Sequence, residues 1–121
     1  MTASLAGRRI LVVEDDFFIA DEVTRDLRAG GAEVIGPAGT VDDALDLLDR
    51  VESLEGAVLD LNLGGEMAFP VADALLARGV PLVFATGYDA AAIPAQYAGV
   101  PCCEKPVDAA RIARALFPLS A

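Results

Sequence analysis

Carboxylates, a hydroxyl and a lysine stand directly after the apolar runs of this chain, where parallel strands of an α/β protein present their reactive side chains. Three acids follow the first run, one acid closes the third, a threonine follows the fourth and a lysine follows the fifth. These residues are Glu14, Asp15, Asp16, Asp60, Thr86 and Lys105. Converging acids repel one another unless a cation lies between them, and oxygen ligands select a hard cation. We therefore expect a Mg²⁺ site at these strand ends.

The residue types also indicate phosphoryl chemistry. With a cation bound, Asp60 is a candidate nucleophile, because aspartyl phosphates are an established class of covalent intermediate. The Lys105 ammonium and the Thr86 hydroxyl are suited to stabilise charge on phosphoryl oxygens. Each residue alone has a simpler interpretation as a helix cap, a turn residue or a solvated charge. Their occurrence in this order at four strand ends favours the functional interpretation.

Strand-sized apolar runs alternate with helical patterns along the whole chain. The predicted strands cover residues 9–13, 33–36, 56–61, 82–85 and 100–103. This alternation predicts an α/β fold with a parallel sheet covered on both faces. Five such units indicate a doubly wound, flavodoxin-like, five-stranded parallel sheet in the order 2-1-3-4-5. We expect a single domain over residues 1–121.

Several residues indicate where the helices begin and end. Gly30 and Gly31 are predicted to end the first helix, and Thr40 to cap the second. The predicted apolar face of the first helix comprises Phe18, Ile19, Val23 and Leu27. The segment 89–99 has few large apolar residues, so we expect a short and mobile helix that begins near Pro94.

The composition excludes several functional classes. The chain has 121 residues, a formal net charge of -10 and no histidine. Nucleic acids and anionic membranes are therefore poor partners, and catalysis by Ser-His-Asp or Cys-His groups is excluded. The adjacent cysteines, Cys102 and Cys103, should point to opposite faces of a strand and form no disulfide. No apolar stretch is long enough to span a membrane and no signal peptide is recognisable, so we expect a cytoplasmic protein.

The segments 10–16, 59–63 and 105–106, together with Thr86, resemble the receiver domain of bacterial two-component response regulators. The resemblance covers essentially the whole chain. It implies that Asp60 is the phosphoacceptor and that Thr86 and Lys105 contact the phosphoryl group. It also implies a cis peptide between Lys105 and Pro106, which X-Pro bonds adopt at little cost.

The resemblance further implies a set of Mg²⁺ ligands. Asp15 and Asp60 match the family's direct carboxylate ligands, and Glu14 matches the neighbouring acid that acts through water. Asn62 matches the residue that offers its backbone carbonyl to the metal. The bound cation allows a phosphoryl group to approach acids that otherwise repel it.

A narrower resemblance concerns the stretch Phe84–Tyr88, which is similar to the "FATGUY" signature of an often stand-alone receiver subgroup. Residues 62–66 fit the same subgroup. Such receivers tend to pair with histidine kinases of the HWE and HisKA2 types. Many receivers carry an aromatic switch residue three positions before the lysine, where this chain has Cys102. Tyr88 and Tyr97 are candidate substitutes or simply surface-packed residues.

The expected reaction is transfer of a phosphoryl group from a kinase phosphohistidine to Asp60. Apart from its own phosphorylation and dephosphorylation, the chain is expected to catalyse nothing. Asn62 and Tyr88 are candidates for tuning the hydrolysis rate. The phosphorylated state is expected either to signal through protein contacts, on a surface around residues 88–105, or to drain phosphoryl groups from a shared kinase.

Three alternatives remain at the level of the sequence. A non-phosphorylated, receiver-like docking or dimerisation module would not need the complete acid, hydroxyl and lysine set. A haloacid-dehalogenase-type phosphohydrolase normally has its nucleophile after the first strand, with a second acid two residues on, whereas Asp60 follows the third strand and Asn62 stands two residues on. A nucleotide-binding fold would need a Gly-x-Gly-x-x-Gly motif after the first strand, where this chain has acids.

Overall fold

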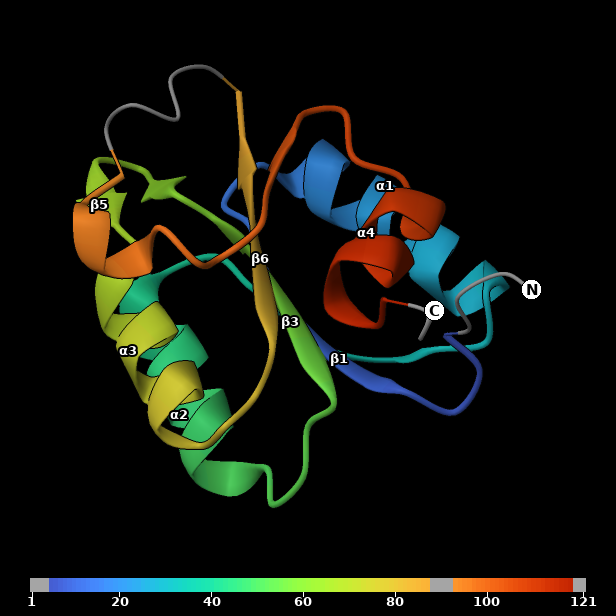
Figure 1. Cartoon of the computed structure of the whole chain (residues 1–121). Helices are drawn as coiled ribbons and strands as arrows, with labels where there is room; N and C mark the ends of the chain where they lie inside the picture. Colours follow the sequence, from blue (N-terminus) through green and yellow to red (C-terminus); the bar gives the residue numbers. More distant parts are fainter. Residues whose placement is uncertain (1–4, 88–92, 119–121) are drawn as a thin grey trace.

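Five strands form one parallel sheet in the computed structural model, which describes residues 5–87 and 93–118. The strands are β1 (Arg9–Val13), β2 (Glu33–Ala38), β3 (Gly56–Asp60), β6 (Leu82–Thr86) and β7 (Cys102–Glu104). Their order across the sheet is β2-β1-β3-β6-β7, and every neighbouring pair is parallel. The predicted order 2-1-3-4-5 and the flavodoxin-like fold are therefore confirmed (Figure 1).

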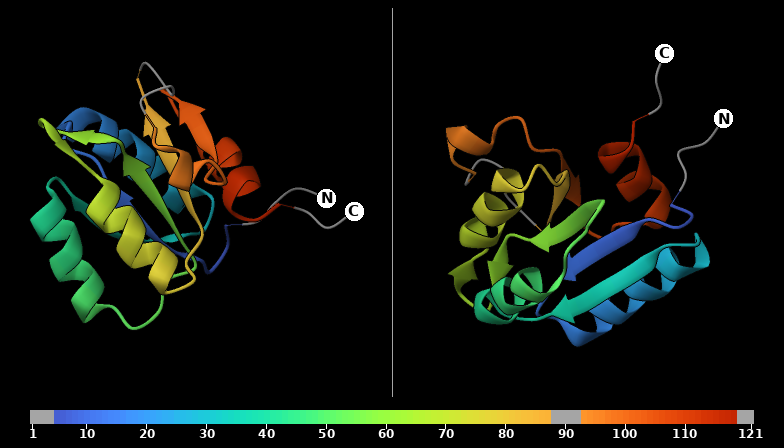
Figure 2. Two further views of the ribbon diagram at one scale, coloured as in Figure 1. Left: turned by 60° about the vertical axis from the view of Figure 1, so that its left-hand side comes forward. Right: turned by 90° about the horizontal axis from the view of Figure 1, so that it is seen from below.

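Within residues 5–87 and 93–118, four α-helices cover the two faces of the sheet in pairs. Helices α2 (Val41–Arg50) and α3 (Phe69–Ala77) lie on one face, and α1 (Phe17–Ala29) and α4 (Ala109–Leu116) lie on the other (Figures 1 and 2). Alternate residues of each central strand enter the two cores, so that Leu59 packs on the α2 side and Val58 on the α1 side. None of the helices in the described part of the chain has the length and apolar character needed to cross a membrane.

Side-chain caps begin three of these helices. Asp16 accepts hydrogen bonds from the backbone N–H groups of the first turn of α1, Thr40 does the same for α2, and Asp108 for α4. Each cap satisfies donors that have no partner within the helix. Gly30 caps the C-terminus of α1 and is followed by Gly31 at φ 94°. The predicted ends at Gly30-Gly31 and the cap at Thr40 are thus confirmed.

The prediction that Phe18 lies on the apolar face of α1 was wrong. The buried residues of α1 are Ala20, Val23, Thr24 and Leu27, whereas 81% of Phe18 is exposed. At about 100° per residue, Phe18 lies about 200° around the helix from Ala20 and so faces away from the sheet. Four strand bounds also needed correction. Strand β2 extends to Ala38, β3 ends at Asp60, β6 extends to Thr86, and the last strand runs from Cys102 to Glu104.

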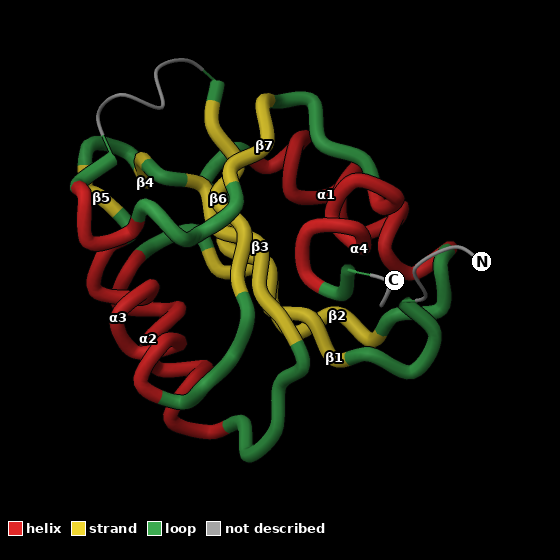
Figure 3. Tube along the Cα trace, viewed as in Figure 1, coloured by secondary structure: helices red, strands yellow, loops and turns green. Residues whose placement is uncertain are grey.

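A small antiparallel hairpin follows β3 and was not predicted. Strand β4 (Asn62–Leu63) pairs with β5 (Glu66–Met67), and the loop between them is Gly64-Gly65 at φ 63° and 98° (Figure 3). A two-residue hairpin loop with positive φ at both positions needs glycine or asparagine. Beyond residues 88–92, the 3-10 helix η2 (Ala95–Tyr97) follows Pro94, in agreement with the short helix predicted there.

Tyr97 joins η2 to the core on the α3 side of the sheet. Its ring stacks on Phe69 with centroids 4.9 Å apart and meets Phe84 edge-to-face at 6.0 Å. Its hydroxyl donates a hydrogen bond to Oδ1 of Asp73 in α3, at 2.6 Å. Burial, and then this hydrogen bond to Asp73, raise the pKa of Tyr97. Tyr97 is therefore a core residue rather than a surface-packed one, while Tyr88 lies outside the described residues.

The two cysteines behave as predicted. Cys102 is exposed, Cys103 is buried, and both are free thiols. The position of the expected aromatic switch residue is thus occupied by an exposed thiol in β7.

Candidate functional site

Sheet topology brings three of the predicted site residues to one edge. Val13 lies opposite Leu59 in the register of β1 and β3, so Glu14 and Asp60 come next to each other one residue further on. Asp60 lies opposite Ala85 in β6, and Thr86 follows. Because all the strands are parallel, these residues emerge at the same carboxyl end of the sheet.

Three carboxylates form a cluster at this edge. Glu14, Asp15 and Asp60 each offer an oxygen, and the three oxygens lie within 4.8 Å of one another. Glu14 and Asp60 are buried, with exposed fractions of 7% and 8%, whereas Asp15 is exposed. Asp16 does not join the cluster, because its carboxylate caps α1. Its backbone N–H donates to Oε2 of Glu14 at 3.1 Å and thereby helps to orient that acid.

Lys105 enters the cluster from the end of β7. Its Nζ lies 2.6 Å from Oε1 of Glu14 and 3.3 Å from Oδ2 of Asp60. Burial alone lowers the pKa of Lys105, but the hydrogen bond to Glu14 and the charges of both acids outweigh burial and raise it. Lys105 therefore remains a full positive charge between two acids. The predicted cis peptide between Lys105 and Pro106 is present.

The carboxyl group of Asp60 is hard to ionise in this setting. Burial, followed by the hydrogen bond with Glu14 and its negative charge, raises the pKa of Asp60 from 3.8 to about 7, although Lys105 acts in the opposite direction. Additional positive charge is needed to ionise Asp60 fully at neutral pH. The three carboxylates supply only oxygen ligands, which suit a hard divalent cation. The chemistry of the cluster thus fits a divalent metal.

Thr86 and Asn62 lie beside the cluster. The backbone carbonyl of Thr86 accepts a hydrogen bond from the Lys105 N–H at 2.9 Å, which holds these two residues together across β6 and β7. The backbone N–H of Asn62 donates to Oδ1 of Asp60 at 3.4 Å. The structure therefore places Glu14, Asp15 and Asp60 in the cluster with Lys105, and Thr86 and Asn62 beside it, whereas Asp16 caps α1 instead.

Sequence reasoning missed the neighbourhood of Gly64. A Cβ atom built on Gly64 lies 3.8 Å from Oδ2 of Asp15, so the tip of the β4–β5 hairpin borders the cluster. The pair Gly64-Gly65 between Leu63 and Glu66 is a hairpin signal in the sequence. Strands of only two residues are too short to show the alternating pattern that identifies a strand.

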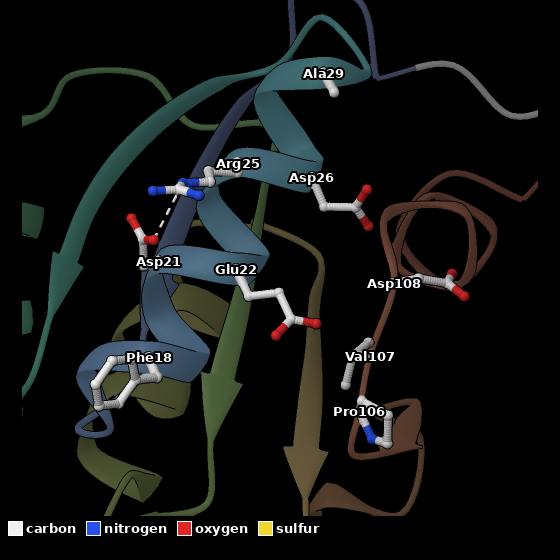
Figure 4. A pocket seen from close by; sticks show the side chains of 9 residues that line it. All are labelled: Phe18, Asp21, Glu22, Arg25, Asp26, Ala29, Pro106, Val107 and Asp108. Atoms are coloured by element: carbon white, nitrogen blue, oxygen red, sulfur yellow. Dashed lines mark ion pairs between the residues drawn. The ribbon is translucent and has the colours of Figure 1, made fainter.

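A groove of about 740 Å³ lies between α1 and the connection from β7 to α4 (Figure 4). Its walls carry apolar residues together with four acids and one arginine. They are Phe18, Asp21, Glu22, Arg25, Asp26, Ala29, Pro106, Val107 and Asp108. Arg25 is paired with Asp21 at 3.1 Å, which leaves the groove acidic overall. Phe17, with an exposed fraction of 76%, stands beside Phe18 on the first turn of α1.

Solved structures and one curated protein resemble the chain, although no protein-family model matches it. The solution structure of SdrG from Sphingomonas melonis Fr1 has a TM-score of 0.78 and 36% identity, over 96% of each chain. A response regulator from Burkholderia pseudomallei, solved with a phosphorylated aspartic acid, a calcium ion and citrate, has a TM-score of 0.79 and 28% identity. That match covers 92% of this chain and 67% of the other.

The curated protein is the uncharacterized transcriptional regulatory protein YbdJ of Bacillus subtilis (strain 168). It is 30% identical over 82 residues, which are 66% of this chain, and the match spans only 35% of YbdJ. Together with the sheet order and the acidic cluster, the likeness to SdrG over nearly the whole of both chains shows the family. The chain belongs to the receiver (REC) domain family of response regulators.

Proposed function

We propose that this receiver domain, expected to span residues 1–121, accepts a phosphoryl group from a histidine kinase onto Asp60 in a Mg²⁺-dependent reaction. The observation that carries the proposal is the position of Asp60, which is buried between a second acid and a lysine at the carboxyl end of the sheet. The phosphorylated aspartic acid and the calcium ion described for the Burkholderia pseudomallei protein support the same chemistry.

Asp15 and Asp60 would hold the cation directly, Asn62 through its backbone carbonyl and Glu14 through water. When bound, the cation supplies positive charge that offsets the acids and the incoming phosphoryl oxygens. The chain supplies the remaining groups. A carboxylate oxygen of Asp60 forms the bond to phosphorus as the bond from phosphorus to the kinase's histidine nitrogen breaks. Hydrolysis of the resulting acyl phosphate by water restores Asp60.

Lys105 and Thr86 act on the phosphoryl oxygens in this proposal. The Lys105 ammonium lies 3.3 Å from Oδ2 of Asp60, so it is close enough to contact the oxygens of a phosphoryl group attached to Asp60. Thr86 is buried beside the cluster, and its hydroxyl is suited to donate to a phosphoryl oxygen. Because the backbones of these two residues are hydrogen-bonded, a movement of one towards a phosphoryl group would also displace the other.

The acidic groove beside α1 is our candidate surface for the kinase. It begins where the chain leaves Lys105 and Pro106, and Phe18 stands exposed at its edge. A helix with basic and apolar residues would complement both the charge and the exposed ring. We expect Phe18→Ser to slow transfer from a histidine kinase while labelling by acetyl phosphate stays unchanged, because a small donor needs no docking surface. Equal slowing with both donors would contradict this assignment.

The kinase type, the location and the output remain proposals. The sequence Phe84–Tyr88 supports a kinase of the HWE or HisKA2 type, which would place the reaction in the cytoplasm. Output passes through protein contacts or consists of draining phosphoryl groups from a shared kinase. The predicted contact surface around residues 88–105 includes η2 but lies partly outside the described residues.

Intact mass spectrometry after incubation with acetyl phosphate and Mg²⁺ tests the central proposal. We expect one added phosphoryl group on the wild type, and none on Asp60→Asn or in the presence of a chelator. Asp49→Asn, which changes an exposed acid at the end of α2, is the matched control and should be labelled like the wild type. A wild type that stays unmodified with both acetyl phosphate and a kinase donor would favour a docking module without phosphorylation.

A further inference from the structure

One side chain closes the turn of the β4–β5 hairpin. Oδ1 of Asn62 accepts a hydrogen bond from the backbone N–H of Gly65 at 2.7 Å, which closes the two-glycine turn. The base of the hairpin is anchored separately, because Leu63 is buried and the Ala68 N–H donates to the Leu61 carbonyl at 2.9 Å. The tip has no such anchor among the contacts described, and two-residue strands are marginal on their own.

The same residue is tied to the acidic cluster through its backbone. The Asn62 N–H donates to Oδ1 of Asp60 at 3.4 Å. Asn62 therefore connects the turn to the acid at the centre of the site, and its amide oxygen is already engaged in the turn.

The tip of the hairpin stands beside the open side of the cluster. Glu14 and Asp60 are buried and Asp15 is exposed, so the cluster opens to solvent at Asp15. A Cβ atom built on Gly64 would lie 3.8 Å from Oδ2 of Asp15, so only the space of about one side-chain atom separates the turn from this carboxylate. A displaced tip would change the space in which the carboxylate of Asp15 can move.

We propose that Asn62 is a positioning residue whose side chain holds the Gly64-Gly65 turn beside Asp15 and thereby raises the affinity of the acidic cluster for a divalent cation. The inference rests on the proposed function in one respect, namely that the cluster binds Mg²⁺. The backbone carbonyl of Asn62 is a proposed ligand, whereas its side chain would act without contacting the metal. Side chains that orient metal ligands in this way commonly change metal affinity 10- to 100-fold. Because the Asn62–Gly65 hydrogen bond is exposed, we expect a smaller effect of roughly 3- to 10-fold.

Calorimetric titration of the unphosphorylated full chain with Mg²⁺, without any phosphodonor, tests the proposal. Asn62→Ala removes the acceptor of the Gly65 N–H and should weaken Mg²⁺ binding by roughly 3- to 10-fold. Asn62→Asp keeps an acceptor at this position and should bind Mg²⁺ at least as tightly as the wild type. Met67→Leu changes the residue opposite Asn62 without removing the turn's hydrogen bond, and should leave the affinity unchanged.

Amide hydrogen exchange of Gly65 reports on the turn independently of the metal. Exchange should become faster in Asn62→Ala and return towards the wild-type rate in Asn62→Asp, while amides of β3 stay protected and show that the fold is intact. Equal Mg²⁺ affinities of the wild type and Asn62→Ala would overturn the inference alone. A wild type that binds no Mg²⁺ would overturn it together with the proposed cation site.

Discussion

Replacing Asp60 by asparagine should stabilise the chain above neutral pH when no divalent cation is present. Burial beside Glu14 raises the pKa of Asp60 from 3.8 to about 7. The unfolded chain ionises this carboxyl group near 3.8, whereas the folded chain keeps its proton up to about 7. The folded state therefore binds more protons in this interval, and the Asp60 contribution to stability falls as the pH rises through it.

The raised pKa sets the size of the effect. The difference between 3.8 and about 7 corresponds to about 4 kcal/mol when Asp60 is fully ionised. Rearrangement of Lys105 and Glu14 around the charge reduces this value, and we expect Asp60→Asn to be about 2 kcal/mol more stable than the wild type at pH 8. At pH 5, where folded Asp60 is protonated, the advantage should fall to less than half of that at pH 8.

Urea unfolding of the wild type and Asp60→Asn at both pH values, in the presence of a chelator, measures the difference. Asp49→Asn controls for the loss of one acid in a strongly acidic chain. At a Mg²⁺ concentration ten times the dissociation constant, the wild type should gain about 1.4 kcal/mol by mass action, and the variant should gain less. An asparagine variant that is no more stable at pH 8, or equally favoured at both pH values, would refute the reasoning.

Three further substitutions test contacts that hold the site's framework, each by urea unfolding. Tyr97→Phe removes the hydrogen bond to Asp73 but keeps the ring stack, and should cost about 1 kcal/mol. Asp26→Ala removes the acceptor that α1 offers to the Ala109 N–H at the start of α4, and should also cost about 1 kcal/mol. Arg78→Met removes donors to three backbone carbonyls at and after the C-terminus of α2 and should cost about 1–3 kcal/mol. An unchanged unfolding midpoint would contradict the corresponding assignment.

The order of the strands and the convergence of the acids could be predicted because both depend on repeated, redundant patterns. Five buried runs specify a parallel sheet, and a parallel sheet brings all its carboxyl ends to one edge. Asp60 and Lys105, 45 positions apart in the sequence, therefore meet without any local signal linking them. The confirmed cis peptide at Lys105-Pro106 came from the family resemblance and not from the residue pattern.

The features that the sequence did not reveal depend on single contacts. Phe18 has the composition of a core residue, and only its angular position on α1 exposes it. The β4–β5 hairpin is too short for a periodic signal and depends on the hydrogen bond from Gly65 to Asn62. The burial of Tyr97 follows from its stack on Phe69, a contact across 28 positions that no local pattern indicates.

The charge balance of the site fits the combination of Lys105 with the proposed divalent cation. Glu14, Asp15 and Asp60 carry three negative charges when ionised, and the Lys105 ammonium offsets one of them. The two remaining charges match one divalent cation. The proposed phosphorylation would replace the single charge of Asp60 by about two, so uncompensated negative charge would return at a buried position. We infer that Lys105 would then move from Glu14 towards the phosphoryl group. Because its backbone N–H is hydrogen-bonded to the Thr86 carbonyl, this movement would also displace the end of β6.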